Sequence, residues 1–452
     1  MNIDKIVQGN IEIRFRKIRL KVKNLIYKLL ILSLCFGCLD AKRVVFDVSS
    51  PSGLIVNAAI AALTKITFPV VTPSPSLPLP TLNYSSNSYS FIRYDTISIT
   101  PTTTGTITSC TIIPTIPAGL SINNTTCAIS GSPTGTQSSI SYMVNATNAS
   151  GSTSVSLSIA ITTAIIYGGK GTGGVIISSD GGNSYLTYTT ANGLGSNSVN
   201  WIYVSGSNVY VATAGGVSIS TNGGTSYTNY TTANGLGNNN VTGVFASVSN
   251  VYAATDGGLS ISTNGGTSYT NYTTANGLGS NLTYSVYASG SNVYVVTAVG
   301  VSISNNGGTS YSSYTTANGL GNNTVLGIYA VGSTVYVGTA SGVSISTNGG
   351  TSYTNYTSGL ASSYIAGIYV IGSNVYVATL SGVGISADGG QTYTTYNTAN
   401  SGLLSNMVYY VYVIGNNVYA ANGGGISVSI NKGLNYTTNF NAAGAVLGVM
   451  AQ

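Results

Sequence analysis

The feature that most constrains the fold is a repeat that occupies the last two-thirds of the chain. A turn motif such as residues 220–227, STNGGTSY, recurs along it. The acidic or amide position of the motif falls at Asp180, Asn222, Asn264, Asn306, Asn348, Asp388 and Asn431, with spacings of 42, 42, 42, 42, 40 and 43 residues. A period of about 40–45 residues that contains four strand-like segments is typical of propeller blades. The sequence therefore predicts one four-stranded sheet for each repeat.

A single repeat shows where these strands should lie. Alternating apolar and polar residues predict strands over 199–204, 209–213, 217–220 and 226–231. The Asn222-Gly223 pair between the third and fourth strands is a strong hairpin signal, because glycine tolerates a positive φ. Residues 232–238 then cross to the next repeat.

The two ends of the repeat region complement each other. The repeat region begins at residues 165–167, which match the second strand of a repeat, and no first strand precedes them. Residues 446–450, at the other end, resemble the first strand of the repeat at 325–329. We therefore expect the C-terminal segment to supply the missing strand, which removes the exposed sheet edges of an open array. The repeat region 164–452 is therefore predicted to be a seven-bladed β-propeller that is closed by the C-terminal strand.

Charge is concentrated at the N-terminus. Residues 1–37 carry eight Lys or Arg and two acidic residues, whereas residues 38–452 carry six of each sign, although charged residues are only 5% of the chain. The mature body thus lacks the basic patch that a phosphate backbone requires, which argues against nucleic-acid binding.

The N-terminal segment predicts export. A basic region followed by the short apolar run 29–37 is typical of a signal peptide, and the run is about half the ~20 residues that would span a bilayer as an anchor. Residues 34–38, LCFGC, resemble a relaxed bacterial lipobox, which implies lipidation at Cys38 after cleavage behind Gly37. The alternative is ordinary signal-peptidase cleavage without a lipid.

Between leader and repeats lies a proline-rich spacer and a second β-rich segment. The segments 116–122, 129–133 and 146–151 resemble the He-PIG family of bacterial surface proteins, which implies an Ig-like, cadherin-like domain over 81–163. Calcium is associated with that family, but Asp95 is the only acidic residue of the segment, so we interpret the domain as a stalk. In an exported chain the remaining pair, Cys110 and Cys127, predicts a disulfide.

The predicted fold class of the whole chain is all-β, with an Ig-like β-sandwich followed by a seven-bladed β-propeller that is closed by the C-terminal strand. The domains expected are 1–37, a lipoprotein signal peptide; 38–80, a linker; 81–163, Ig-like; and 164–452, the propeller.

The repeated turn resembles the Asp-box (BNR) motif of sialidases and other propellers, and the repeats also resemble those of sensor-type regulator propellers. Both resemblances imply the propeller fold and say little about function. The Asp or Asn of the motif is expected to hold the turn together. Sialidases need an arginine cluster, and residues 165–452 contain no Arg, so that activity does not transfer.

Few residues could carry catalysis. The chain has no His, which excludes Ser-His-Asp triads and His-based metal sites. Residues 165–452 contain only five charged residues: Lys170, Lys432, Asp180, Asp256 and Asp388. A facing pair of carboxylates, as glycosidases need, is therefore not expected. We predict a non-enzymatic protein without metal or cofactor.

The connections between second and third strands, and those between repeats, should share one face of the propeller. Its variable residues are Lys170, Asp256, Val299, Ser341 and Leu380, and we predict that this face, with the mouth of the central channel, binds the partner. The leading hypothesis is a monomeric, lipid-anchored protein of the outer membrane or cell surface that binds host matrix protein, glycan or another envelope protein. The alternatives are a sialidase-like hydrolase and an envelope assembly factor or ligand sensor.

Overall fold

The computed structural model describes residues 77–452. The predicted signal peptide, Cys38 and most of the 38–80 linker lie outside the described residues. Within 77–452 the chain is all-β, as predicted, with 37 strands and four 3-10 turns. No helix in this part of the chain is long and apolar enough to span a membrane.

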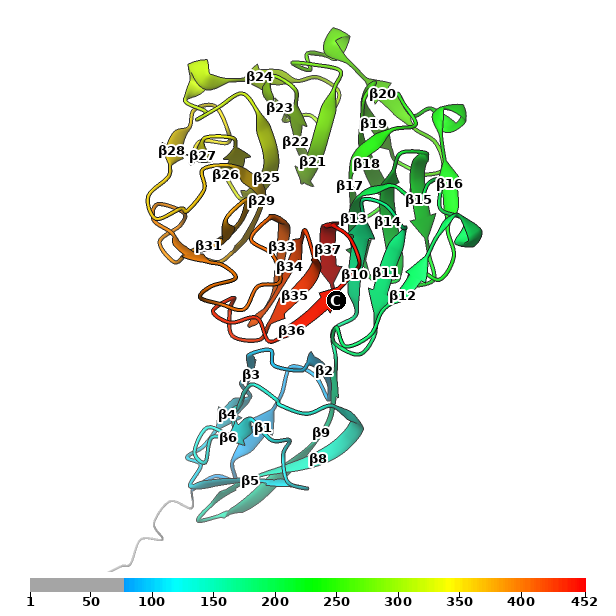
Figure 1. Cartoon of the computed structure of the whole chain (residues 1–452). Helices are drawn as coiled ribbons and strands as arrows, with labels where there is room; N and C mark the ends of the chain where they lie inside the picture. The colour runs from blue at the N-terminus through cyan, green and yellow to red at the C-terminus, as the bar shows by residue number, and fades with distance from the viewer. Residues whose placement is uncertain (1–76) are drawn as a thin grey trace, which may run out of the picture. The chain divides into compact units, whose positions relative to one another are not determined.

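Strands β1 to β9 form the N-terminal, Ig-like part (Figure 1). A four-stranded sheet has the order β2-β9-β8-β5, a three-stranded sheet the order β3-β7-β6, and β1 pairs with β4. Leu157, Ile159 and Val144 from the long hairpin are fully buried between them. The strands are β1 (Thr81–Asn83), β2 (Ser88–Ile92), β3 (Ile97–Ile99), β4 (Thr102–Thr104), β5 (Ser109–Ile113), β6 (Leu120–Ile122), β7 (Ile129–Gly131), β8 (Gln137–Asn148) and β9 (Gly151–Thr162).

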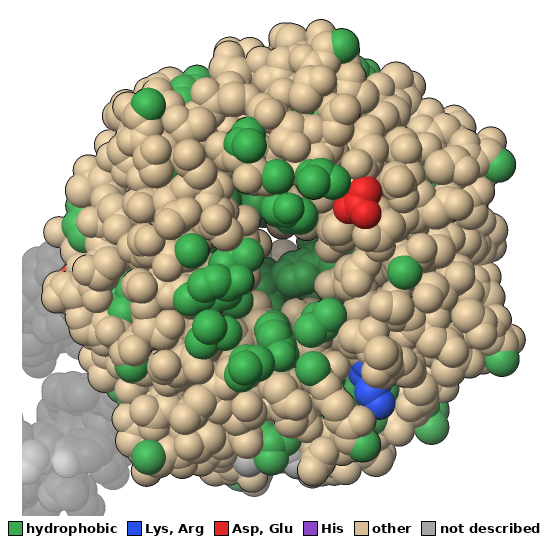
Figure 2. Space-filling view, turned by 45° about the horizontal axis from the view of Figure 1, so that its top comes forward, with side chains coloured by type: hydrophobic (Ala, Val, Ile, Leu, Met, Phe, Trp, Pro, Cys, Tyr) green, Lys and Arg blue, Asp and Glu red, His purple; other side chains and the backbone are tan. Residues whose placement is uncertain are grey.

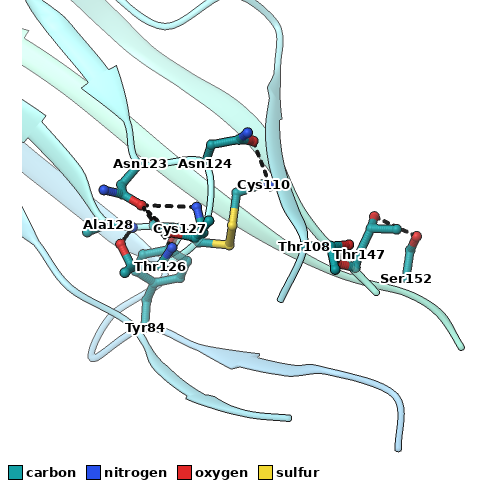
Figure 3. Close-up of a disulfide and its surroundings, with 11 residues drawn as sticks. Tyr84, Thr108, Cys110, Asn123, Asn124, Thr126, Cys127, Ala128, Thr147 and Ser152 are labelled. Carbon is teal, nitrogen blue, oxygen red and sulfur yellow. Dashed lines mark hydrogen bonds between the residues drawn. A yellow bond between two sulfur atoms is a disulfide. The ribbon is translucent and has the colours of Figure 1, made fainter. Parts of the chain in front are cut away.

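A disulfide joins Cys110 on β5 to Cys127 in the turn between β6 and β7 (Figure 3). Both cysteines are buried, and the Tyr84 hydroxyl donates a hydrogen bond of 2.6 Å to the Cys127 carbonyl oxygen. The side-chain oxygen of Asn123 accepts from the backbone N–H of Thr126, which shapes the same turn. The bridge therefore fixes this turn to the neighbouring sheet.

Residues 166–451 form seven four-stranded antiparallel sheets. The second, third and fourth strands of the first sheet are β10 (Ile166–Lys170), β11 (Val175–Ser178) and β12 (Leu186–Tyr188). The other six sheets, each in chain order, are β13 (Val199–Ser205), β14 (Asn208–Thr213), β15 (Gly216–Ser220) and β16 (Thr228–Tyr230); β17 (Val241–Ser247), β18 (Asn250–Thr255), β19 (Gly258–Ser262) and β20 (Thr270–Tyr272); β21 (Thr283–Ser289), β22 (Asn292–Thr297), β23 (Gly300–Ser304) and β24 (Ser312–Tyr314); β25 (Val325–Val331), β26 (Thr334–Thr339), β27 (Gly342–Ser346) and β28 (Thr354–Tyr356); β29 (Ile365–Ile371), β30 (Asn374–Thr379), β31 (Gly382–Ser386) and β32 (Thr394–Tyr396); and β33 (Val408–Ile414), β34 (Asn417–Asn422), β35 (Gly425–Ser429) and β36 (Thr438–Asn441).

The last strand, β37 (Val446–Ala451), belongs to the first sheet. It pairs antiparallel with β10, where Tyr167 is the register partner of Met450. The first strands of successive sheets are neighbours in the order β13, β17, β21, β25, β29, β33 and β37, and β37 in turn contacts β13 (Figure 1). These strands therefore surround a common centre.

The segments that connect the sheets are ordered by a recurrent local signal. In the sequence TTANGL, Thr189 caps the 3-10 turn η1 (Thr190–Asn192), and Asn192 returns a side-chain bond to the Thr189 N–H. Gly193 follows with a φ of 95°, and Leu194 is buried against the next sheet. The same structure recurs at η2 (Thr232–Asn234), η3 (Thr274–Asn276) and η4 (Thr316–Asn318). The sequence predicted only that these segments cross from one repeat to the next.

Candidate functional site

A cavity of about 600 Å³ lies at the centre of the seven sheets, and the first strands supply most of its lining. Figure 2 shows one face of the ring, hollowed at its centre, with hydrophobic side chains gathered around the opening. Three sets of equivalent positions on the first strands build the cavity from its mouth inwards. None of the lining residues is a Lys, Arg, Asp or Glu.

The outermost set is produced by a β-bulge at the start of every first strand. In β13 the pairing with β14 passes from Val199 directly to Trp201, so that Asn200 has no partner across the ladder. The same irregularity recurs in the other six sheets. Bulges commonly redirect a side chain next to a functional site. The bulged residues, which we call the mouth residues, all line the cavity: Asn200, Thr242, Tyr284, Leu326, Ala366, Tyr409 and Leu447.

The second set contains two large rings among five small residues. By register with the second strands, its members are Trp201, Gly243, Ser285, Gly327, Gly367, Tyr410 and Gly448. The Trp201 and Tyr410 rings meet edge to face with centroids 4.4 Å apart. A Cβ on Gly448, which lies on the strand between them, would approach Trp201 Cε3 to 3.3 Å. The two rings therefore fill one part of the channel, and the cavity extends over Ser285, Gly327 and Gly367.

The third set is an almost continuous belt of aromatic rings. Tyr203, Phe245, Tyr287, Tyr329, Tyr369 and Tyr412 each pair with a tyrosine of their second strand. Successive ring centroids are 4.8, 5.0, 4.9, 5.3 and 4.9 Å apart, and Met450 occupies the seventh position. Tilted and edge contacts between aromatic rings contribute about 0.5–1.5 kcal/mol each beyond their buried area. We call this set the aromatic belt.

The buried tyrosines of the cavity have raised pKa values. Burial, with a smaller contribution from Tyr412, raises the pKa of Tyr203 to about 12. Burial also raises the pKa of Tyr369 and of Tyr410, and neighbouring tyrosines add to it. With no Lys, Arg, Asp or Glu in its lining, the site therefore offers aromatic rings and phenol hydroxyl groups but no side chain that is charged at physiological pH.

The five residues predicted for the binding face lie at the connections between second and third strands. Lys170 Nζ donates to the Ala442 carbonyl oxygen at 2.7 Å, and Asp256 Oδ2 accepts from Asn240 Nδ2 at 2.7 Å. Ser341 Oγ accepts from Asn322 Nδ2 at 3.2 Å. Val299 and Leu380 are exposed, and of the five only Leu380 lines the cavity.

The turn residues lie at the opposite ends of the strands from these connections, where Gly223 N–H donates to the Ser207 carbonyl oxygen of the adjacent turn. Ser184 Oγ donates to Asp180 Oδ2 at 2.6 Å. Asp180 Oδ1 accepts from the Ser184 N–H at 3.0 Å and from Ser178 Oγ at 2.7 Å, and together these bonds lower the pKa of the Asp180 carboxyl to about 2. The side-chain oxygen makes equivalent bonds at Asn222, Asn264, Asn306, Asn348, Asp388 and Asn431.

Sequence reasoning located the cavity mouth only in outline and did not find the residues that line it. A signal was present, because the mouth position varies through Asn, Thr, Tyr, Leu, Ala, Tyr and Leu while the residue before it is Val, Ile or Thr in every repeat. That position could not be assigned to the cavity without the bulge, since strict alternation along the strand would place it differently.

The described residues offer no evident metal centre. Within 77–452 there is no group of three or more His, Cys, Asp or Glu that could hold an ion. The geometry instead suits non-covalent binding through ring faces, apolar contacts and hydroxyl groups.

Comparison with known proteins agrees with the fold. Residues 68–163 match the family described as "Putative Ig domain". No curated protein matches the chain. A crystal structure named as the extracellular domain of a putative one component system from B. thetaiotaomicron is 18% identical with a TM-score of 0.50, over 61% of this chain and 40% of that chain.

Two further solved structures are similar. The extracellular domain of a putative hybrid two component system from B. thetaiotaomicron is 16% identical with a TM-score of 0.49, over 70% of this chain and 45% of that one. An ancestral GH74 enzyme is 21% identical with a TM-score of 0.42, over 56% and 38%. The chain thus spans less than half the length of these proteins, and at such identities the first likeness supports the fold alone.

Proposed function

We propose that this chain is an exported, lipid-anchored surface protein in which an Ig-like stalk carries a closed seven-bladed propeller, and that the propeller binds its partner at the cavity mouth without catalysing a reaction. The partner would be a host matrix protein, a glycan or another envelope protein.

The variation of the mouth residues carries the proposal. Across seven otherwise similar repeats the flanking position is Val, Ile or Thr, as packing requires, whereas the mouth residues range from amide to phenol to aliphatic. Packing alone would give seven similar residues at a position repeated by the fold. A concave, mostly apolar cavity with a few polar groups is also the usual form of a ligand site.

A binding screen with surface variants tests this. Full-length protein would be applied to an array of matrix proteins and glycans, next to a Tyr284→Ala/Leu380→Asp variant altered at the mouth and a Ser247→Asp/Ser289→Asp variant altered where first strands end. We expect the mouth variant to lose at least tenfold in affinity and the second variant to bind normally. The opposite pattern would contradict the proposal.

The anchor has its own test, since Cys38 lies outside the described residues. We expect Cys38→Ser to abolish incorporation of labelled fatty acid and to release the protein from the membrane fraction. Export without labelling in the unaltered protein would instead indicate ordinary cleavage.

A further inference from the structure

The chemistry of the central cavity restricts the ligand beyond what the proposed function states. We propose that the cavity is a binding site for an uncharged saccharide of one to three rings. This inference rests on the proposed binding function and specifies the class of its ligand.

The first argument is charge. No Lys, Arg, Asp or Glu lines the cavity, and the pKa values of Tyr203, Tyr369 and Tyr410 are raised. A carboxylate, sulfate or ammonium group placed there would lose its hydration without a partner of opposite charge, which is costly. Charged ligands are therefore disfavoured.

The second argument is shape. Trp201 and Tyr410 line one side of the cavity, and the rings of the aromatic belt line it further in, so that aromatic side chains supply much of its lining. The apolar C–H face of a pyranose ring complements an aromatic ring, and aromatic side chains contribute large contact areas at a low cost in conformational entropy. The volume of about 600 Å³ lies within the range of about 300–1,000 Å³ for small-ligand sites.

The third argument is the set of polar groups at the mouth. Asn200 Nδ2 donates to the Val241 carbonyl oxygen at 2.7 Å, but its own side-chain oxygen accepts no bond from any residue of the described chain. The hydroxyl groups of Tyr284 and Tyr364 likewise have no partner among residues 77–452, and both side chains line the cavity. A hydrocarbon ligand would leave these groups unsatisfied, whereas sugar hydroxyl groups would pair with them.

The only Trp of the chain, Trp201, lies in the cavity wall, so its fluorescence reports occupancy directly. We would titrate the full-length protein in detergent with cellotriose, maltotriose and triacetylchitotriose, and with deacetylated chitotriose and trigalacturonate as charged counterparts. We expect at least one neutral trisaccharide to change the Trp201 emission with saturation, and the charged sugars to bind at least tenfold more weakly.

Two filled-cavity variants and a control make the site specific. Ser285→Phe and Ala366→Phe place a ring inside the lining, whereas Ser289→Phe adds the same ring at the exposed end of β21. We expect at least tenfold weaker binding for either cavity variant that keeps the circular-dichroism spectrum and melting temperature of the unaltered protein, and normal binding for the control.

The outcomes separate the two proposals. Three results would overturn the saccharide proposal: no fluorescence change and no calorimetric heat with any neutral sugar, equal binding of the charged sugars, or binding only of an apolar dye. In each case the array experiment would still decide whether the protein has the proposed binding function. Saturable sugar binding that does not compete with the partner found on the array would instead uphold the cavity site and contradict the mouth as the partner's site.

Discussion

At the scale of single residues, every sheet of the repeat contains one tyrosine whose hydroxyl group is buried without a hydrogen-bond partner in the described chain. These are Tyr185, Tyr227, Tyr269, Tyr311, Tyr353, Tyr393 and Tyr436. Each is the last residue of its turn motif and lies under the glycine two positions after the Asp or Asn, as Tyr311 does under Gly308, whose added Cβ would be 2.8 Å from the hydroxyl. The ring therefore contributes packing, whereas the buried, unpaired hydroxyl group lowers the free energy of unfolding.

We accordingly expect Tyr311→Phe to raise the free energy of unfolding by about 1 kcal/mol, because an unsatisfied buried hydroxyl costs about 1–3 kcal/mol. Chemical denaturation monitored by circular dichroism would measure it. Tyr314→Phe, at a half-buried position in the same sheet, serves as control and should change stability by less than about 0.5 kcal/mol. A loss of stability in Tyr311→Phe would show that the hydroxyl does find a partner.

The turn motif tolerates either a carboxylate or an amide because its partner is a hydroxyl group that can reverse. Thr392 Oγ1 donates to Asp388 Oδ2 at 2.6 Å, whereas Asn306 Nδ2 donates to Ser310 Oγ at 2.8 Å. The two versions differ in their response to acid. The pKa of the Asp180 carboxyl is lowered to about 2 from 3.8, and that of Asp388 is lowered too, in each case by hydrogen bonds within the turn.

A carboxyl whose pKa is lower in the folded state stabilises the fold above the unfolded pKa and loses that contribution as the pH falls through the folded value. We expect the double variant Asp180→Asn/Asp388→Asn to melt close to the unaltered protein at pH 7 and to lose less stability between pH 4 and pH 2. Melting curves at half-unit pH steps measure this. Parallel decline of the two proteins would mean that other groups control acid unfolding.

At the scale of elements, the period of the repeat predicted the four-stranded sheets well. The observed β13, β14 and β15 agree with the predicted strands to within one residue, while β16 (Thr228–Tyr230) is shorter than the predicted 226–231. The fourth strand is shortened because Tyr227 N–H donates to the Asn192 carbonyl oxygen of a connecting segment instead of to the third strand. Pairing of that kind is not visible in local propensity.

The cavity was less predictable for a related reason. Which residues belong to each of the three sets that line the cavity depends on the register of the strand pairs and on the bulge after Val199. Both are set by contacts between strands. The edge-to-face pair of Trp201 and Tyr410 also depends on Gly448, which is far from both in sequence. The sequence therefore predicted the strands, but not the residues that line the cavity.

The pairing of β37 with β10 gives the prediction that belongs to this scale. Deletion of residues 446–452 would expose the edge of β10 and remove the buried Val449 and Met450. We expect the truncated protein to lose its compact monomeric state and its cooperative melting transition, as size-exclusion chromatography with light scattering and calorimetry would show.

The control for that deletion is Gln452→Ala, which removes only the side-chain bond of 2.9 Å to the Tyr167 hydroxyl and leaves the strand in place. It should remain a compact monomer with a melting temperature close to that of the unaltered protein. An unchanged truncated protein would mean that β37 does not close the ring.

At the scale of the whole molecule, the chain is rich in tyrosine and poor in charged residues. Of its 452 residues, 34 are tyrosines and only 22 are charged. The tyrosines under the turns, those of the second strands and those of the aromatic belt are mostly buried, and burial is the largest cause of every raised tyrosine pKa in the structure. Folding and tyrosine ionisation are therefore coupled across all seven sheets.

The coupling predicts alkaline unfolding. A tyrosine whose pKa is about 10 when unfolded and higher when folded stabilises the protein fully below pH 10, and the contribution is lost as the pH rises through the folded value, about 12 for Tyr203 and for Tyr84. Each unit of difference corresponds to about 1.4 kcal/mol for a fully buried group and to less for half-buried rings such as Tyr84 and Tyr203, so that several such groups together contribute a large share of the stability of an ordinary domain. We therefore expect cooperative unfolding between pH 10 and pH 12, with the absorbance of tyrosinate at ~295 nm rising together with the loss of circular dichroism. If most tyrosines ionised near pH 10 while the β-sheet signal persisted, their rings could not be packed between the sheets as described. Coincidence of the two signals would instead show that the fold is stabilised by keeping these hydroxyl groups protonated.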